Sequence, residues 1–206
     1  MKLYFSPGAC SLAAHIALRE AGLKPDLEKV DLAAKKTERG ADYWSINPKG
    51  YVPALQLDDG EVLTEVSALL QYVADQKPAT KLLPVPGTIE RARVLEWIGF
   101  IASELHKGFG PLWKPNTPEA YKAIVIETLA KRLQYVESQL GSQYLTGAQF
   151  TVADAYLFVI VSWAKYLKVD LTPYARLRAL LDRIAARPAV REAMVAEGLI
   201  KEKVEA

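Results

Sequence analysis

The sequence predicts a two-domain protein in which a small α/β domain is followed by an all-helical domain. Strand-like and helix-like segments alternate over the first 76 residues. A segment rich in proline follows at 77–87, and beyond it apolar residues recur only at helical spacing. We therefore expect one domain at 1–80, a linker at 81–86 and a helical domain at 87–206.

The first domain is expected to follow the order β-α-β-(α)-β-β-α. Short apolar runs predict its strands, and apolar residues three and four apart predict its helices. The sequence Asp58-Asp59-Gly60 separates two apolar runs and indicates a hairpin turn. We expect strands at 2–5, 28–32, 52–57 and 61–64, and helices at 10–22, near 42–45 and at 65–76.

The second domain contains one segment that differs from the others. Residues 152–167 are apolar on nearly all sides, which predicts a buried central helix. Thr151 and Asp154 at its start match the capping-box pattern, which is a signal for folding rather than for catalysis. We expect helices at 88–113, 118–140, 152–167, 173–186 and 188–197.

Composition and charge argue against several classes of function. The formal net charge is +2 over 206 residues and no dense Lys/Arg patch is present, so no nucleic-acid partner is expected. The longest apolar run, 155–161, is far shorter than the ~20 residues that a membrane span needs, and the start lacks a signal-peptide pattern. We expect a cytoplasmic protein without a membrane partner, and the motifs predict no metal and no nucleotide.

Cys10, the only cysteine, stands where the first strand is expected to turn into the first helix. The N–H groups that begin a helix carry partial positive charge, so a thiolate pKa below the free value of about 8.5 is expected. The alternative is a small buried side chain that only packs. Because Ala13 stands three residues on, a two-cysteine cycle is excluded unless the second thiol comes from outside the chain. Ser11 is a candidate helix cap or minor donor, with a hydroxyl nucleophile left open, and His15 is expected to be structural.

Two other places suit the two ends of an amino-acid ligand. Pro53 precedes a strand, where a cis bond would leave the neighbouring backbone available to a ligand, although an ordinary strand-start proline explains it as well. Glu65 stands at an expected helix start, where its carboxylate suits an ammonium group and the N–H groups suit a carboxylate. The alternative is that Thr64 caps this helix and Glu65 complements its dipole.

The helix expected at 88–113 carries a stripe of small and polar residues. Gly99, Ser103, His106 and Gly110 are spaced by four, three and four, and Lys107 is four residues from Ser103. A groove wall beside a ligand and a solvated helix face both fit this spacing, so the stripe alone does not decide between them.

Five segments in order resemble the cytosolic glutathione S-transferases, most closely the bacterial beta class: "MKLYFSPGACSL", "GYVPALQLDDG", "LTEVSALLQYVADQ", "IASELHK" and "FTVADAYLF". The resemblance covers essentially the whole chain. It implies a thioredoxin-like N-terminal domain, an α-helical C-terminal domain and a homodimer. It also implies glutathione as a co-substrate and no tightly bound cofactor.

The resemblance implies roles for residues of the first domain. Cys10 would meet the sulfur of glutathione, and Pro53 would follow a cis peptide bond. The backbone of Val52 would pair with the cysteinyl part of glutathione. Glu65 would hold the γ-glutamyl end, and Lys35 would reach the glycyl carboxylate.

One position departs from the family pattern. Many transferases have Ser after the residue matching Glu65, and beta-class chains often have Gly, but this chain has Val66 followed by Ser67. The N–H of Val66 remains available to the γ-glutamyl end, while a side-chain hydrogen bond from this position is impossible. From the helical domain the resemblance adds Ser103 and Glu104, approaching from the neighbouring subunit, and His106 and Lys107 within the subunit.

The function implied is an enzyme that activates the glutathione thiol and conjugates it to small apolar electrophiles, with Cys10 and His106 as catalytic residues. A pocket for the electrophile is expected between the domains near Phe109, Trp113 and Trp163. A mixed disulfide at Cys10 would add thiol–disulfide exchange or reductive dehalogenation. The alternative is a non-catalytic protein on the same fold that binds glutathione or hydrophobic ligands.

Overall fold

The computed structural model describes residues 1–202. Its internal contacts divide the chain into two compact units. The first unit is Met1–Leu82 together with the chain from Ala186 onward, and the second is Leu83–Ala185. The expected domain boundaries around 81–86 stay a prediction, but by contacts the last helix belongs to the first unit and not to the helical one.

The first unit is built on a mixed sheet, in which the described residues form five strands in the order β3-β2-β1-β4-β5. The strands are β1 Lys2–Phe5, β2 Asp26–Asp31, β3 Lys36–Thr37, β4 Ala54–Gln56 and β5 Val62–Thr64. β1 is parallel to β2 and antiparallel to β4, so that Leu3 lies opposite both Leu27 and Leu55. The loop that follows β1 therefore begins at the centre of the sheet.

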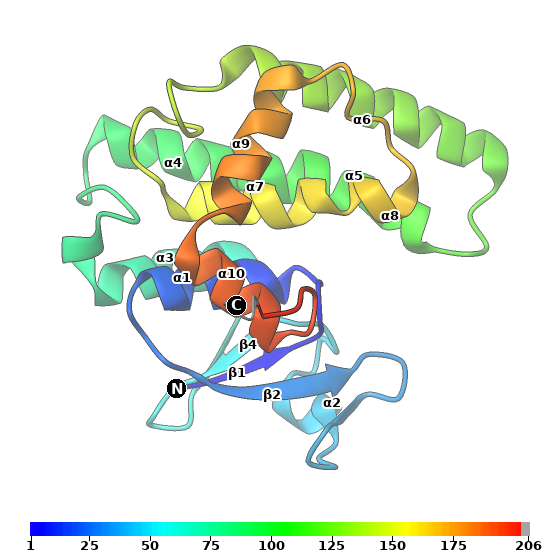
Figure 1. Cartoon of the computed structure of the whole chain (residues 1–206). Coiled ribbons are helices and arrows are strands. Elements are labelled where there is room, and N and C mark those ends of the chain that lie inside the picture. The colour runs from blue at the N-terminus through cyan, green and yellow to red at the C-terminus, as the bar shows by residue number, and fades with distance from the viewer. Residues whose placement is uncertain (203–206) are drawn as a thin grey trace. The chain divides into compact units, whose positions relative to one another are not determined.

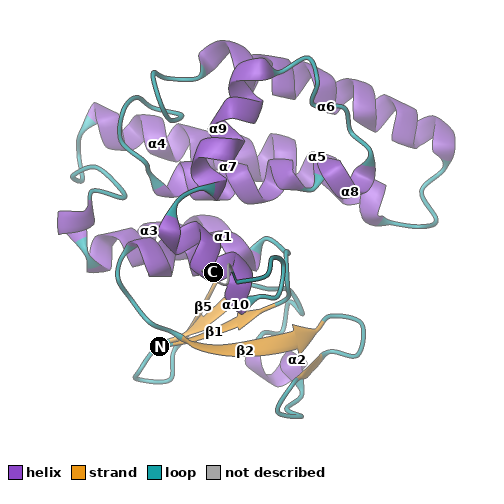
Figure 2. Ribbon diagram, viewed as in Figure 1, coloured by secondary structure: helices purple, strands orange, loops and turns teal. Residues whose placement is uncertain are grey.

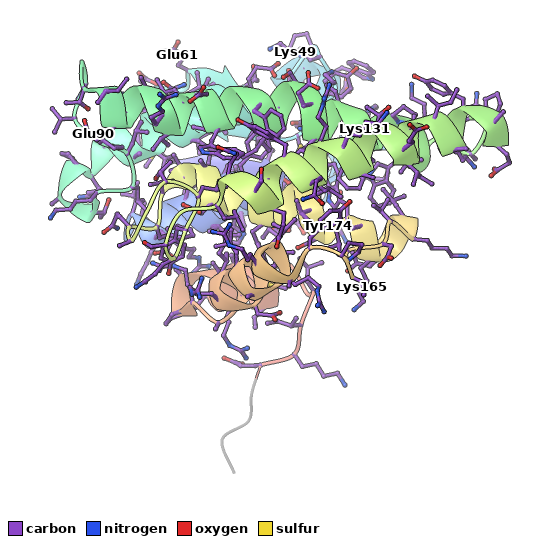
Figure 3. The ribbon with its side chains drawn as sticks, turned by 90° about the horizontal axis from the view of Figure 1, so that it is seen from above. Lys49, Glu61, Glu90, Lys131, Lys165 and Tyr174 are labelled. Carbon is purple, nitrogen blue, oxygen red and sulfur yellow. The ribbon has the colours of Figure 1, made fainter. Side chains whose placement is uncertain are left out.

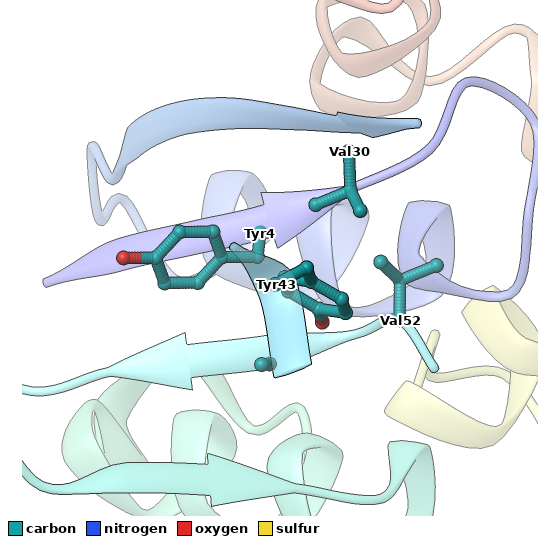
Figure 4. Close-up of a cluster of buried hydrophobic side chains, with 5 residues drawn as sticks. Tyr4, Val30, Tyr43 and Val52 are labelled. Atoms are coloured by element: carbon teal, nitrogen blue, oxygen red, sulfur yellow. The ribbon is translucent and has the colours of Figure 1, made fainter. Parts of the chain in front are cut away.

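Helices cover both faces of this sheet (Figures 1 and 2). One face carries α1 Ser11–Glu20, α3 Val66–Gln76 and α10 Pro188–Ala196, and the other carries the short α2 Tyr43–Ile46. A 3₁₀ turn, η1 Pro78–Thr80, follows α3. Under α2, buried side chains from strands, loop and helix form one apolar cluster (Figure 4): Tyr4, Val30, Tyr43, Val52 and Ala54.

The sequence analysis missed β3. This strand has only two residues and pairs antiparallel with β2, with Val30 opposite Thr37. A two-residue strand within a polar stretch shows no periodicity, so only its partner strand defines it.

The last helix, expected in the helical domain, packs against α1 instead. Arg187 donates to both carboxylate oxygens of Glu20, at 2.6 and 2.7 Å. Nδ1 of the fully buried His15 lies 3.0 Å from Oε1 of Glu197, and Oε2 of Glu197 accepts from the N–H of Gly8 at 3.0 Å. The expectation that His15 is structural is confirmed, and Glu197, directly after α10, is bonded to the loop after β1.

The second unit is helical throughout its regular structure. Its helices are α4 Ile89–Phe100, the π-helix η2 Ile101–His106, α5 Lys107–Trp113, α6 Glu119–Gln139, α7 Val152–Ser162, α8 Ala164–Leu167 and α9 Ala175–Ala185. The first three run on without a break, as the single helix predicted there. Every residue of α7 from Val152 to Val161 is buried, which confirms a buried central helix there. The helix expected to continue to 167 ends at Ser162 instead, and Lys165 and Tyr166 in the separate α8 are exposed.

The capping box at the head of α7 is confirmed. The buried carboxylate of Asp154 accepts from the N–H and the hydroxyl of Thr151, both at 2.8 Å, and from the N–H of Leu145 at 2.8 Å. Burial raises the pKa of Asp154 to about 6, against the lowering effect of these bonds. Among residues 1–202, no helix has the length and apolar character needed to cross a bilayer.

Candidate active site

Cys10 occupies the corner between β1 and α1, as predicted. It is the N-cap residue of α1, and the loop before it closes through a 3.0 Å bond from the N–H of Ala9 to the carbonyl of Ser6. Gly8 within this loop has φ +69°, a conformation that residues with a Cβ rarely adopt. The partly buried thiol of Cys10 donates to the carbonyl oxygen of Val52 at 3.1 Å.

The expected lowering of the Cys10 pKa is wrong for this structure. Burial raises the pKa of Cys10 to about 12, and the negative charge of Glu65 adds to the rise. The N–H groups of Cys10 and Ser11 favour the thiolate, but their effect is smaller than the cost of removing it from water. Cys10 is therefore a neutral thiol, which acts as a hydrogen-bond donor.

Ser11 is bonded within the loop. It is fully buried, its hydroxyl donates to the carbonyl of Ser6 at 3.3 Å, and it accepts from the N–H of Ser6 at 3.2 Å. No side chain caps α1, so the expected role of Ser11 as a helix cap is wrong. Because this hydroxyl both donates and accepts a hydrogen bond with Ser6, it stabilises the turn between β1 and α1. Nothing in this geometry makes it a nucleophile.

The peptide bond between Val52 and Pro53 is cis, which confirms the expectation from the family resemblance. Two side-chain donors bond the backbone of Tyr51, which precedes this peptide bond. The hydroxyl of Tyr43 and the side-chain amide of Asn47 both donate to the carbonyl of Tyr51, each at 2.7 Å. These two bonds hold the residue before Val52 in place, and the Val52 carbonyl accepts from Cys10.

Glu65 has an unusual backbone conformation at the start of α3. Its φ is +73° and its ψ is 122°, and such left-handed conformations in residues with a side chain cost of order 1–3 kcal/mol. Thr64 does not cap α3, and its hydroxyl instead accepts from Lys49 at 3.0 Å. The alternative of a Thr64 cap is thus wrong. Val66 is buried and Ser67 is partly exposed in the first turn of α3.

Lys35 also has a positive φ, of 55°. Its ammonium group donates to the carbonyl of Gly50 at 2.8 Å and lies 5.4 Å from the ring centre of Trp44. Gly50 itself has φ +67°, and a Cβ there would come within 2.7 Å of the Trp44 ring. Trp44 and Gly50 together hold Lys35, and the sequence analysis did not identify either of them.

The polar residues predicted on the long helix of the second unit fall in and beside its π-helix. π-Helices occur often at functional sites. The hydroxyl of Ser103 donates to the carbonyl of Gly99 at 3.0 Å, and Glu104 accepts from Arg132 at 2.6 Å. Lys107 is exposed at the start of α5. These contacts place Glu104 in an ion pair within its own chain.

His106 lies against a group of aromatic side chains in the second unit. Its Nδ1 is 2.7 Å from the hydroxyl of the buried Tyr156, and its ring is 5.1 Å from that of Trp163. Phe109 and Trp113 meet the same Trp163 ring edge-on, at 6.2 and 5.7 Å. The three predicted aromatic residues are thus brought together, but Phe109 is fully buried while Trp113 is half exposed.

Besides Trp44 and Gly50, the sequence analysis did not identify three further residues of the candidate site: Lys49, Arg132 and Tyr156. Each meets its partner through the fold, at 16, 28 and 50 residues of separation. Spacing rules act over one or two helical turns and do not reach so far. Within residues 1–202, no group of three or more His, Cys, Asp or Glu side chains is arranged to hold a metal ion.

Two family models match the chain. The glutathione S-transferase N-terminal domain matches residues 7–76, and the glutathione S-transferase C-terminal domain matches residues 103–195. The chain is 50% identical to glutathione S-transferase GstA of Escherichia coli O157:H7 over 200 residues, which span 97% of this chain and 100% of the relative.

Solved structures agree with these matches. The bacterial beta-class glutathione S-transferase of Sphingomonas chungbukensis is 47% identical, with a TM-score of 0.93 over 97% of this chain and 100% of that one. A sphingomonad glutathione S-transferase complexed with glutathione is 48% identical, with a TM-score of 0.92 and the same coverage. The chain therefore belongs to the glutathione S-transferase family and resembles most closely its bacterial beta class.

Proposed function

We propose that this enzyme binds glutathione in its first unit and conjugates the sulfur to small apolar electrophiles. One observation carries the proposal: the Cys10 thiol and the Val52 carbonyl meet at 3.1 Å at the head of α1. A peptide-like ligand beside Val52 would bring its own sulfur to the start of this helix. There the N–H groups and the helix dipole stabilise a thiolate.

Cys10 acts in this proposal as a neutral donor. Because its pKa is raised to about 12, the thiol keeps its proton near neutral pH. When glutathione binds, the S–H can turn from the Val52 carbonyl to the glutathione thiolate. A hydrogen bond to the charged form lowers the pKa of the glutathione thiol, so the conjugating nucleophile forms at neutral pH. The thiolate then forms a sulfur–carbon bond with the electrophile held beside it, either by displacing a leaving group from that carbon or by adding to it.

The two ends of glutathione are held by charge. Glu65 binds the γ-glutamyl ammonium, and the N–H groups of Val66 and Ser67 at the start of α3 bind the neighbouring carboxylate. Lys35, fixed by Trp44, binds the glycyl carboxylate. The strained backbone of Glu65 supports this role, because such strain is concentrated at ligand sites.

We also propose roles for residues of the second unit. His106, oriented by Tyr156, and Lys107 bind or polarise the reactants. The exposed face of Trp113, backed by Trp163 and Phe109, binds the apolar electrophile. We propose a homodimer in which Ser103 and Glu104 complete the site of the other subunit. The expected cytoplasmic location stays a prediction.

Thiol–disulfide exchange and reductive dehalogenation are the second candidate. Both would use Cys10 as a nucleophile, and only the thiolate attacks sulfur efficiently. A pKa of about 12 leaves little thiolate near neutral pH, so conjugation is favoured over these reactions. Cys10→Ala separates them, because it removes every reaction through a mixed disulfide and leaves the helix N–H groups in place.

The test measures binding and turnover on the same preparation. Wild-type protein should bind glutathione in a calorimetric titration and conjugate it to chlorodinitrobenzene. Glu65→Ala should weaken binding by roughly 1–3 kcal/mol, because a ligand ammonium loses its partner. Binding without turnover would instead favour the non-catalytic ligand-binding protein. Equal affinity in wild type and Glu65→Ala would remove Glu65 from the site.

A further inference from the structure

Glu65, the proposed partner of the ligand ammonium, already bonds a cation of its own chain. The ammonium group of Lys49 lies 2.7 Å from Oε1 of Glu65 and donates to the hydroxyl of Thr64 at 3.0 Å. The side chains of Lys49 and Glu65 are 50% and 65% exposed, so this pair is in contact with solvent and can open.

Two fixed backbone segments bring these side chains together. Lys49 lies in the loop just before β4, and Glu65 directly follows β5. β4 and β5 pair antiparallel, with Ala54 opposite Thr64, so the start of one strand lies beside the end of the other. The pairing of β4 with β5 therefore brings the loop that carries Lys49 near the residue that directly follows β5.

We propose that Lys49 is an internal competitor for the ammonium site of Glu65 and thereby determines how selectively the enzyme recognises the amino end of its ligand. The proposal rests on the proposed function of Glu65. A bound ammonium gains only the difference between its own bond to Glu65 and the bond of Lys49 that it displaces. A ligand without an ammonium leaves the Lys49–Glu65 pair intact, so it loses little binding free energy relative to a ligand that has one. Lys49 thus reduces the discrimination between the two kinds of ligand.

The experiment compares two ligands and four proteins. The ligands are glutathione and its deamino analogue, glutaryl-cysteinylglycine, which lacks the ammonium and keeps the rest of the peptide. The proteins are wild type, Lys49→Gln, Lys49→Arg and the control Lys131→Gln. Lys131 is a matched control, because it is an exposed lysine paired with Glu127 at 2.7 Å on α6 (Figure 3).

The ratio of the two dissociation constants is the readout. Lys49→Gln should increase the preference for glutathione about two- to fivefold, the range expected for an exposed ion pair. Lys49→Arg, which keeps the cation, should retain the wild-type ratio, and so should Lys131→Gln. The gain in Lys49→Gln should shrink in high salt, since exposed charges are screened.

The results that would overturn the role of Lys49 differ from the result that would overturn the proposed function. If wild type binds glutathione but Lys49→Gln has an unchanged or smaller ratio, the competitor role is wrong. If Lys49→Gln weakens both ligands equally, Lys49 binds another part of the ligand and the proposal is again overturned. If wild type binds neither ligand, the proposed function itself fails, and this inference fails with it.

Discussion

The heads of α1 and α7 present the same physical situation with opposite outcomes. Each is a helix start that follows a loop, and at each a titratable side chain is removed from water. Asp154 at α7 accepts three hydrogen bonds within its own unit. The thiol of Cys10 at α1 is a donor, to the carbonyl of Val52.

The difference in hydrogen bonding distinguishes a helix start that is stabilised by its own side chains from one that is available to a ligand. At α7 the capping box satisfies the N–H groups of Thr151 and Asp154 with side chains of the helix start itself. At α1 no side chain caps the helix, and its N–H groups face a thiol that stays neutral. Positive potential that is not neutralised by the protein is available to an anionic ligand.

The sharpest test of the comparison is the reactivity of Cys10. Its raised pKa keeps the thiolate scarce until the pH approaches about 12, so alkylation by iodoacetamide near pH 8 should be at least a hundredfold slower than for a free thiol. Unfolding the protein in guanidinium should restore the ordinary rate. Because there is one cysteine, the measurement reports on this site alone. A titration midpoint below the free-thiol value would contradict the neutral-donor role.

A smaller but still large effect is expected at the other helix. Asp154→Ala leaves buried donors of Leu145 and Thr151 without an acceptor and should lower the free energy of unfolding by about 3 kcal/mol. The matched control is Asp170→Ala, which removes an exposed carboxylate bonded to the N–H of Thr172 at 2.8 Å. Its expected loss is below about 0.5 kcal/mol. Similar unfolding midpoints for the two variants would show that burial does not distinguish these carboxylates.

The smallest effect is expected for the capping-box threonine. Thr151→Ala removes one hydroxyl that donates to Asp154 and should cost about 1 kcal/mol of unfolding free energy. Conjugation activity per folded molecule should not change, because the Thr151 hydroxyl donates to Asp154 and not to a residue of the proposed site. Chemical denaturation followed by fluorescence, with activity measured on the same samples, checks both statements. A loss of specific activity in the folded variant would show that the capping box also positions Tyr156 for its contact with His106.

Features set by neighbouring residues were predictable from the sequence, and features set by distant ones were not. The two residues of the capping box are three positions apart, and the turn at Cys10 lies where the apolar pattern changes from strand-like to helical spacing. Both features were therefore predicted. The position of α10 and the pairing of Lys49 with Glu65 depend on contacts across the fold. The Cys10 pKa depends on how deeply the finished structure buries the thiol. Two opposing effects act on it, and the sequence does not reveal which is larger.

The bond from Gly8 to Glu197 also has a consequence for synthesis. The first unit needs both ends of the chain, and residues 83–185 are made between them. During synthesis α1 is complete long before α10 has been made. Until then the side of α1 that packs against α10 is uncovered, and the ring of His15 lacks its bond to Glu197. An N-terminal domain ordinarily folds first as a chain emerges. Here the unit that carries Cys10 reaches its final bonding only when the last helix has left the ribosome.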